Sequence, residues 1–300
     1  MSEVLLIDGK KCIYKCNYKD DAKLRNSFNS LTEKTYGFNF EQWYEDGYWG
    51  DKYIPYSLLD GDKVVSNVSV SVMDFLILGE QKRYVQIGTV MTDEEYRGQG
   101  LCRALMELVL KEWKNKCDLI YLFANDSVLD FYPKFRFEVC DEYQYSINKT
   151  KEDKTENIRK MSIDNDSDRE TIYNIACNTI PFSKVSMKNN TSLIMFDCTS
   201  FMKDNIYYLE DYDTVVICEF NKDILYLQEV LSAKEVKLDN IINATMNEKT
   251  KKVVLGFTPE DTSSYEKTLV NEEDTTLFIK IGKDNPFKTE DLMFPVLSHA

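Results

Sequence analysis

Apolar and polar residues follow two different rhythms in the first half of the chain. Between residues 67 and 72 valine occupies every even position, while asparagine or serine occupies every odd one. A period of two is typical of a strand with one buried and one solvated face, so we expect a half-buried strand over 64–73. Similar runs predict strands over 54–59 and 84–91. The Asp-Gly-Asp sequence at 60–62 has the composition of a hairpin turn.

The pattern changes to a helical period over residues 101–116. The residues that share one face at this spacing are Leu101, Ala104, Leu105, Leu108, Val109 and Trp113. Another helix is expected over 20–36. The uninterrupted apolar run 119–124 predicts a strand buried on both faces, and Ser127–Asp130 has the form of a capping box for a short helix.

The second half of the chain repeats this mixture. We expect helices over 168–177 and 238–246, and strands over 206–209, 214–220, 224–231, 253–255 and 276–281. A charged stretch over 148–156 separates the halves and reads as a linker. Because 300 residues exceed one ordinary core, the sequence predicts a domain over 1–148, a linker over 149–160 and a second α/β domain over 161–300.

The net charge of −14 narrows the classes of partner. A surface this acidic is repelled by a phosphate backbone, so we expect neither a nucleic-acid nor an anionic-membrane partner, and homo-oligomerisation stays open. The N-terminus has no basic segment followed by an apolar run, and no 18 consecutive apolar residues occur.

The cysteines bear on location and on metal binding. Cys12 and Cys16 have a metal-like spacing, but no second Cys/His pair follows and the only histidine is His299. We therefore expect no metal, reduced thiols and a cytoplasmic protein.

The segment 96–103 joins an expected strand to the helix over 101–116. Gly98 and Gly100 let the backbone approach an anion closely, and Arg97 and Arg103 add positive charge. Taken alone, this spacing fits a tight turn as well as a phosphate site. A Walker loop is excluded because no Gly-Lys-Ser/Thr follows, and a dinucleotide fingerprint is excluded because Arg103 stands where a third glycine is needed.

The segment 89–105 resembles the signature strand, loop and helix of the GNAT N-acetyltransferase superfamily. The family pattern Q/R-x-x-G-x-G/A reads Arg97-x-x-Gly100-x-Cys102 here. With a residue larger than glycine or alanine at the last position, the segment resembles the subgroup of enhanced-intracellular-survival acetyltransferases. The resemblance implies a GNAT fold of the α/β class, with a mixed, mostly antiparallel central sheet flanked by helices.

The resemblance also implies acetyl-coenzyme A (acetyl-CoA) as cosubstrate, with its pyrophosphate on the loop amides and its pantetheine arm along the preceding strand. The residues implied in cofactor binding are Val90, Met91, Thr92, Arg97, Gly98, Gln99, Gly100, Leu101, Cys102, Arg103 and Asn125. The second half contains no Arg-x-x-Gly loop, so we expect it to be a smaller, degenerate GNAT-like domain that binds no coenzyme A and completes the acceptor cleft or mediates dimerisation.

A second stretch, 123–138, resembles the family segment that carries a tyrosine acid. Tyr132 stands at that position and would protonate the leaving thiolate. Two residues depart from the family pattern: Arg136 replaces a glycine, and Pro133 removes a helical N–H. The implied reaction is acetyl transfer to a primary amine of a small molecule or peptide. The alternative is a GNAT-fold module that binds coenzyme A or senses a ligand without turnover.

The base and the acceptor wall are less well defined. In the resembling subgroup the terminal carboxylate acts as the base, which makes Ala300, or the neighbouring His299, the candidate here. The aromatic residues Trp43, Tyr48 and Trp49 can stack on a sugar or a cation of the acceptor. Aromatic residues are more often core than ligand-binding, and core is the reading that we prefer for these three.

Overall fold

The computed structural model describes residues 3–152 and 157–300, and the part of the expected linker at 153–156 lies outside them. The helices are α1 (Ala22–Tyr36), α2 (Glu41–Glu45), α3 (Leu101–Trp113), α4 (Asp166–Asn178), α5 (Thr191–Thr199) and α6 (Leu238–Thr245). Short 3-10 turns are η1 (Glu94–Tyr96), η2 (Asp126–Val128), η3 (Tyr132–Phe135), η4 (Glu210–Tyr212), η5 (Pro286–Lys288) and η6 (Val296–Ser298).

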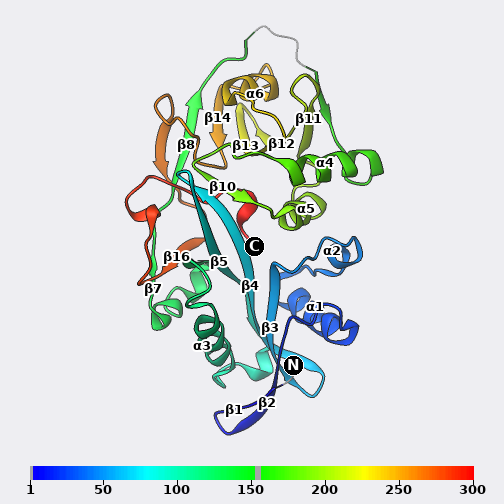
Figure 1. Ribbon diagram of the computed structural model, residues 1–300, viewed down its shortest axis with the longest axis vertical. Coiled ribbons are helices and arrows are strands. Elements are labelled where there is room, and N and C mark those ends of the chain that lie inside the picture. Colours follow the sequence, from blue (N-terminus) through cyan, green and yellow to red (C-terminus); the bar gives the residue numbers. More distant parts are fainter. Residues whose placement is uncertain (1–2, 153–156) are drawn as a thin grey trace.

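Two sheets lie at opposite ends of an elongated molecule (Figure 1). The first sheet has the order β1 (Glu3–Ile7), β2 (Lys10–Cys16), β3 (Tyr53–Asp60), β4 (Lys63–Ile77), β5 (Glu80–Thr92), β6 (Leu119–Ala124), β16 (Thr276–Lys280) and β7 (Phe137–Val139), with β10 (Val185–Lys188) on the far end of β4. The second has the order β15 (Glu266–Leu269), β8 (Tyr143–Asn148), β14 (Lys252–Leu255), β13 (Ile224–Ser232), β12 (Thr214–Asn221), β11 (Ile206–Leu209) and β9 (Ile158–Lys160).

The two sheets share one topological feature, a parallel strand pair connected by a helix. Most neighbouring strands are antiparallel, but β5 and β6 are parallel and are joined through α3, and β13 and β14 are parallel and are joined through α6. Parallel neighbours need such a crossover, and a helix supplies it. The mixed, mostly antiparallel sheet with flanking helices is therefore confirmed, and the second half repeats the same unit on a smaller scale.

Strands from both halves of the chain enter each sheet. β16 lies between β6 and β7 of the first sheet, and β8 pairs with β14 and β15 of the second. The expected boundaries at residues 148 and 160 stay a prediction. The strand order shows that neither sheet is built from one continuous stretch of sequence.

One expectation about β4 is wrong. The strand is not half-buried, because its polar face is buried as fully as its valine face: Asn67 and Ser69 are both fully inaccessible to solvent. α3 covers the valine face, and α1 packs on the same sheet from the other side. The buried polar groups satisfy one another, since Asn67 Nδ2 donates to Ser69 Oγ at 2.9 Å and Ser57 Oγ donates to Asn67 Oδ1 at 2.8 Å.

Long periodic segments were predicted well, and short or edge elements were not. The expected strand over 119–124 is confirmed as β6, and its residues are almost all buried. The capping box at 127–130 is wrong: the turn there is η2, which begins after Asn125 and has no side-chain cap. The hairpin β1–β2 and the helix α5 were not predicted. α5 is largely apolar and lies buried between the sheets, and its few polar residues do not gather on one face to give a period.

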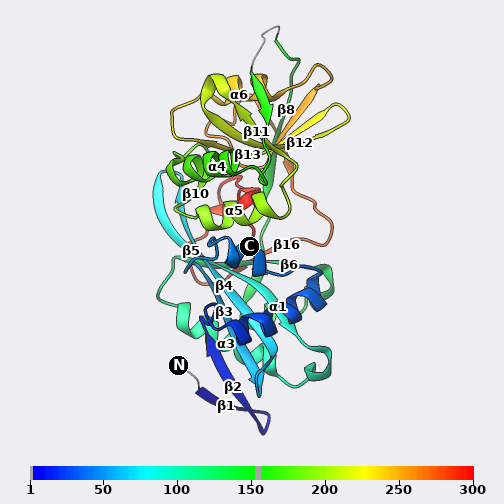
Figure 2. The ribbon, with the colours of Figure 1, turned by 90° about the vertical axis from the view of Figure 1, so that its right-hand side faces the viewer.

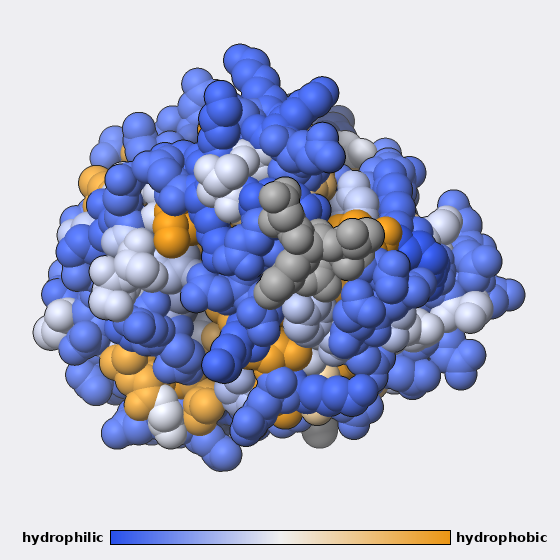
Figure 3. Space-filling model, turned by 90° about the horizontal axis from the view of Figure 1, so that it is seen from above, coloured by the Kyte–Doolittle hydropathy of each residue, from blue (hydrophilic) through white to orange (hydrophobic). Residues whose placement is uncertain are grey.

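The last residues of the chain run between the two sheets, where the C-terminus is marked in Figures 1 and 2. Three backbone N–H groups of this tail donate hydrogen bonds to other segments. Met293 N–H donates to Thr258 Oγ1, Phe294 N–H to Glu142 Oε1, and Val296 N–H to the Gly256 carbonyl. Viewed from the second-sheet end, the visible surface is largely hydrophilic, with small scattered apolar patches (Figure 3).

Candidate active site

A gap between two parallel strands forms the floor of the site. β5 and β6 are paired only over Tyr84–Gln86 and Leu119–Tyr121, although β5 continues to Thr92. From Ile87 onward the backbone of β5 has no partner strand on that side. A strand edge of this kind offers N–H and C=O groups to an extended ligand.

A bulge in β5 occurs beside this gap. Asn67 is opposite Met91 and Ser69 is opposite Gly88, so the β5 strand has one extra residue there, and Thr89 takes a left-handed conformation with φ 46°. Side chains replace the lost ladder bonds: Asn67 Nδ2 donates to the Thr89 carbonyl at 2.8 Å, and Tyr36 Oη donates to the Val90 carbonyl at 2.8 Å. These bonds hold the bulge in a fixed shape.

The loop between β5 and α3 presents a row of free backbone donors. Gly98 and Gly100 both have positive φ, 73° and 75°, which glycine adopts without strain. Within the described residues, none of the N–H groups from Gly98 to Arg103 has a hydrogen-bond partner. Successive free N–H groups at a helix N-terminus form an anion site, and Arg97, whose side chain is 62% exposed, adds positive charge at its rim.

The tip of the β1–β2 hairpin lies against this loop. Lys10 Nζ donates to Gln99 Oε1 at 2.7 Å, and a side-chain carbon at Gly100 would lie 2.8 Å from Asp8 Oδ2. Only glycine at position 100 allows the Asp8 carboxylate to come so close. A negative charge therefore stands beside the donors that are expected to hold phosphate.

Two cavities adjoin at the loop. The smaller, about 700 Å³, contains the loop and the hairpin tip, and the larger, about 900 Å³, extends along β5 toward the C-terminus. Both are lined by Thr92, Arg97, Cys102 and Phe131. Every residue expected to bind cofactor lines one or both of them. Burial raises the pKa of the Cys102 thiol to about 12, so this side chain is neutral between the two cavities.

Tyr132 lies in the wall of the larger cavity and is 5% exposed. Burial, followed by the neighbouring Cys102 and Tyr36, raises its pKa above the ordinary value, so the phenol carries its proton at neutral pH. Within the described part of the chain its hydroxyl makes no hydrogen bond. It is therefore free to donate to a group that enters the cavity.

The turn η3 explains both departures from the family pattern around Tyr132. Pro133 occupies the first turn of η3, where a missing N–H breaks no bond within the helix. Arg136 follows η3 in the left-handed region, at φ 63° and ψ 41°, the conformation that glycine adopts most easily. The arginine keeps the turn at a cost of roughly 1 kcal/mol.

The C-terminal residues enter the same cavity from the opposite side. Gln86 Nε2 donates to the Ala300 carbonyl oxygen at 2.9 Å, and a Cβ at Gly88 would lie 2.7 Å from that oxygen. His299 stacks on Phe123 with 3.9 Å between ring centroids, and burial lowers the pKa of His299 to about 4. Gly88 and Gln86 were not predicted from the sequence, although an isolated glycine within a strand pattern signals a close approach.

Only one of the three aromatic residues considered for the acceptor wall lines the cavity. Trp43 lines the larger cavity and is 4% exposed, whereas Tyr48 and Trp49 are not among its lining residues. Tyr48 stacks on Tyr173, and Trp49 stacks on Trp43 inside the aromatic core.

Asn125 also lines the larger cavity, but its side chain is already engaged. Its amide donates to Asp274 Oδ2 at 2.8 Å, so Asn125 anchors the loop that precedes β16. Asp274, like Asn125, lines the cavity, and no sequence pattern predicts this contact between residues 149 positions apart.

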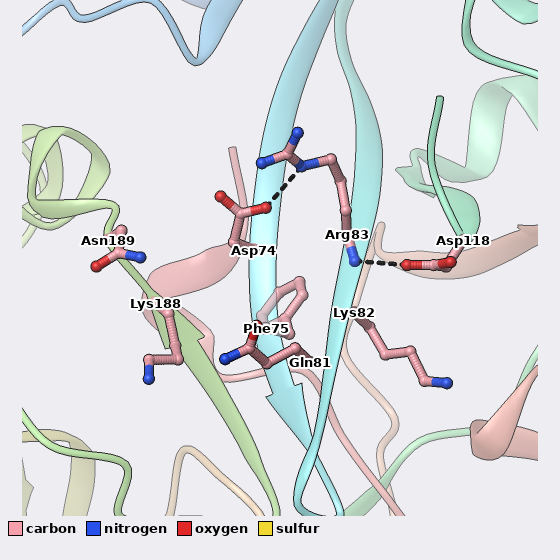
Figure 4. A pocket seen from close by; sticks show the side chains of 8 residues that line it. All are labelled: Asp74, Phe75, Gln81, Lys82, Arg83, Asp118, Lys188 and Asn189. Atoms are coloured by element: carbon pink, nitrogen blue, oxygen red, sulfur yellow. Dashed lines mark hydrogen bonds and ion pairs between the residues drawn. The ribbon is translucent and has the colours of Figure 1, made fainter. Parts of the chain in front are cut away.

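A third cavity, about 440 Å³, opens on the outer end of the β4–β5 hairpin (Figure 4). Both of its carboxylates are already engaged: Arg83 Nε donates to Asp74 Oδ1 and the Arg83 backbone N–H donates to Asp118 Oδ2, both at 2.7 Å. No residue of the phosphate loop or of the C-terminal tail lines this cavity.

Neither a metal site nor a membrane-spanning helix occurs in the part of the chain that the structure describes. No group of three or more His, Cys, Asp or Glu side chains is placed there to hold a metal ion. No helix of this part is long and apolar enough to cross a membrane.

Residues 23–140 match the sequence model of the acetyltransferase (GNAT) domain, which covers the loop, α3 and Tyr132. This part of the chain is a GNAT acetyltransferase domain. No curated protein matches the chain.

Several solved structures resemble this chain over almost its whole length. A protein of Enterococcus faecalis described as "Probable N-Acyltransferase" shares 17% identity with a TM-score of 0.60, covering 89% of this chain and 71% of the other. Eis1 of Mycobacterium abscessus shares 11% identity with a TM-score of 0.53, covering 88% and 72%. A GCN5-related N-acetyltransferase of Kribbella flavida shares 14% identity with a TM-score of 0.53, covering 89% and 71%. At these identities the likeness shows a shared fold, which extends through both sheets.

Proposed function

We propose that this protein transfers an acetyl group from acetyl-CoA to a primary amine of a small molecule or peptide. The observation that carries the proposal is the continuous path from the free amides of Gly98–Arg103, along the open edge of β5, to Tyr132 on one wall and the C-terminal residues on the other. Eight unpaired cysteine thiols fit the cytoplasmic location that belongs to this proposal.

The residues present fit coenzyme A. Six consecutive backbone donors, with Arg97 and Arg103, match a pyrophosphate, and the β5 backbone from Val90 to Thr92, which has no partner strand on the β6 side, matches the amides of a pantetheine arm. The cosubstrate supplies an acyl thioester. The protein must then supply a proton acceptor for the amine, donors for the developing oxyanion and a proton for the sulfur.

Tyr132 is the proposed acid. The amine nitrogen forms a bond to the carbonyl carbon, the carbon–sulfur bond breaks, and the sulfur takes the Tyr132 proton, which solvent then restores. The backbone N–H groups of Val90 and Met91, next to the bulge, are the proposed oxyanion donors.

The C-terminal segment is the proposed base. It offers the carboxylate of Ala300 and the imidazole of His299, both of which line the cavity. With a pKa near 4, His299 is a weak base at neutral pH, so the Ala300 carboxylate is the better proton acceptor. We expect a one-residue C-terminal extension to reduce turnover more than His299→Ala does.

The decisive test pairs Tyr132→Phe with acetyl-CoA binding. The wild type should be stabilised by acetyl-CoA in a thermal-shift titration and should release coenzyme A in an amine-dependent way across a panel of aminoglycosides, polyamines, amino acids and peptides. Tyr132→Phe should bind acetyl-CoA normally and lose roughly 10²–10⁴ in kcat. Binding without turnover on any amine would instead identify a coenzyme A-binding or ligand-sensing module.

A further inference from the structure

One face of α5 forms part of the wall of the larger cavity. Leu193, Phe196 and Asp197 share this face at i, i+3 and i+4, and all three line the cavity. The helix comes from the second half of the chain and lies near the C-terminus between the two sheets (Figure 2). A carboxylate therefore belongs to an otherwise apolar helix face.

Asp197 is buried without a partner. Its side chain is 8% exposed, and within the described residues Oδ2 has no hydrogen-bond donor. Burial raises the pKa of Asp197 well above the ordinary value, which reflects the cost of placing its charge away from solvent. The residue also lies in the last turn of α5, where the helix dipole disfavours a negative charge. Each of these features destabilises the fold, so Asp197 is poorly explained as a structural residue.

Aromatic rings surround the same part of the cavity. Phe196 packs against Phe38, Phe40, Trp43 and Phe201 with centroid distances of 5.2 to 6.2 Å, and all five rings line the cavity. Aromatic faces attract a cation, most strongly where water is excluded. Among the described residues that line this cavity, the only lysine or arginine is Arg97, at its phosphate end.

Asp197 and the aromatic rings favour a charged group, so the amine that they bind is not the one that reacts. A nitrogen must be neutral to attack a thioester, and a carboxylate beside an amine favours the charged, unreactive form. Asp197 therefore matches a cationic group that keeps its charge throughout the reaction. Its carboxylate would pair with that group while the rings cover the remaining faces.

Building on the proposed function, we propose that Asp197 and the rings around Phe196 bind a second ammonium group of the acceptor. The acceptor is then a di- or polyamine, with its non-reacting nitrogen at Asp197 and its reacting nitrogen near Ala300. Asp197 in this role is a specificity residue that does not touch the reacting atoms.

The test compares matched acceptors in full-length protein. Butylamine, 1,4-diaminobutane and spermidine are assayed with wild type, Asp197→Asn, Asp197→Glu and Asp204→Asn. Asp204, which is 80% exposed, lies near Lys160 and does not line the cavity, controls for the change in net charge. We expect the wild type to prefer the diamine or triamine over butylamine. In Asp197→Asn, KM for these should rise roughly 10- to 100-fold, as expected for losing a charge-assisted contact, while kcat and the butylamine constants stay within about twofold.

Calorimetry with spermidine, without acetyl-CoA, separates this proposal from the proposed function. Spermidine binding that is lost in Asp197→Asn and retained in Asp197→Glu supports the subsite, even if no amine is turned over. Equal KM values for butylamine and the polyamines, or polyamine binding that is unchanged in Asp197→Asn, overturns it while amine turnover stands. Phe201→Ala, whose ring is 58% exposed, is the second variant and should weaken spermidine binding without disturbing the core.

Discussion

At the scale of single residues, a few small contacts decide whether the proposed chemistry can take place. Gly88 has ordinary backbone geometry, so its role is steric: a methyl group there would lie 2.7 Å from the Ala300 oxygen. Gln86 then holds that oxygen through its amide. The last residue reaches β5 because position 88 has no side chain.

We expect Gly88→Ala to displace the C-terminal residues and lower kcat at least ~10-fold, because a proton acceptor moved by about 1 Å loses its geometry. Acetyl-CoA affinity should change little. Steady-state kinetics and a thermal-shift titration measure the two effects. Deleting residues 298–300 should cost at least as much, and in the Gly88→Ala background the combined loss should be smaller than the sum of the two separate losses in free energy, since both changes act on the Gln86–Ala300 contact. Additive losses would contradict this explanation.

Glu142 makes stability depend on pH. It is 8% exposed and accepts the Phe294 N–H at 2.7 Å, and burial raises its pKa from 4.5 to about 8. Between about pH 4.5 and pH 8, the folded protein therefore keeps a proton on Glu142 that the unfolded chain has already released. The stability associated with this proton is present in acid and is lost as the pH rises through 8.

Glu142→Gln removes this titration and leaves an acceptor for Phe294 N–H. We expect the variant and the wild type to have similar free energies of unfolding at pH 5, and the variant to be more stable by roughly 1–3 kcal/mol at pH 9. Urea denaturation at pH 5, 7 and 9 measures the difference. Glu290→Gln, an exposed acid nearby, should show no such trend. A pH-independent difference would rule out Glu142 as the titrating group.

At the scale of secondary structure elements, the β1–β2 hairpin acts on a loop far from it in sequence. Its tip brings Lys10 to Gln99 and Asp8 to Gly100. Asp8 itself takes a left-handed conformation, φ 46°, in the two-residue turn with Gly9. The hairpin therefore adds a negative charge to a site that is otherwise built to attract phosphate.

Asp8→Asn should strengthen coenzyme A binding, because it removes that repulsion and keeps the shape of the turn. We expect Kd to fall roughly 2- to 10-fold at low ionic strength, with the gain shrinking as salt screens the charges. Calorimetry at 20 mM and 300 mM salt, taken as roughly low and high screening, tests this. Asp62→Asn, on the exposed turn after β3, is the control and should bind like the wild type.

At the scale of the whole molecule, the two sheets depend on each other. The first needs β10, β16 and the tail from the second half, and the second needs β8 from the first. One apolar core contains residues as distant in sequence as Phe40, Phe196 and Phe294. The molecule is therefore expected to unfold as one unit although it contains two sheets.

We expect the fragment 1–148, expressed alone, not to fold, because β6 and β7 lose the strand that joins them and Phe123 and Tyr121 lose their aromatic partners. Circular dichroism and binding of an apolar dye should show an expanded, exposed chain. The full-length protein should give a single unfolding transition by both probes. A fragment that folds cooperatively and binds acetyl-CoA would show that residues 1–148 are an independent domain.

The sequence by itself determined the local structure of the cofactor half. The 3.6-residue period of α3, the alternation in β4 and the glycines of the loop are set by neighbouring residues, so they can be read directly. The motif spacing from Arg97 to Tyr132 also indicates the GNAT domain that residues 23–140 match. Period-two alternation in β4 was misread as half-exposed because polarity along a strand does not reveal whether a helix covers it.

Only the tertiary structure decided how distant segments meet. The β1–β2 hairpin at the loop, Asp274 at Asn125, Asp197 in one cavity with Phe38, Phe40 and Trp43, and Ala300 at Gly88 all bring together residues separated by about 90 positions or more. Such contacts are made by strand order and core packing, which depend on the whole chain at once. For that reason the sequence could suggest a cofactor, whereas the candidate acceptor site became visible only in the folded molecule.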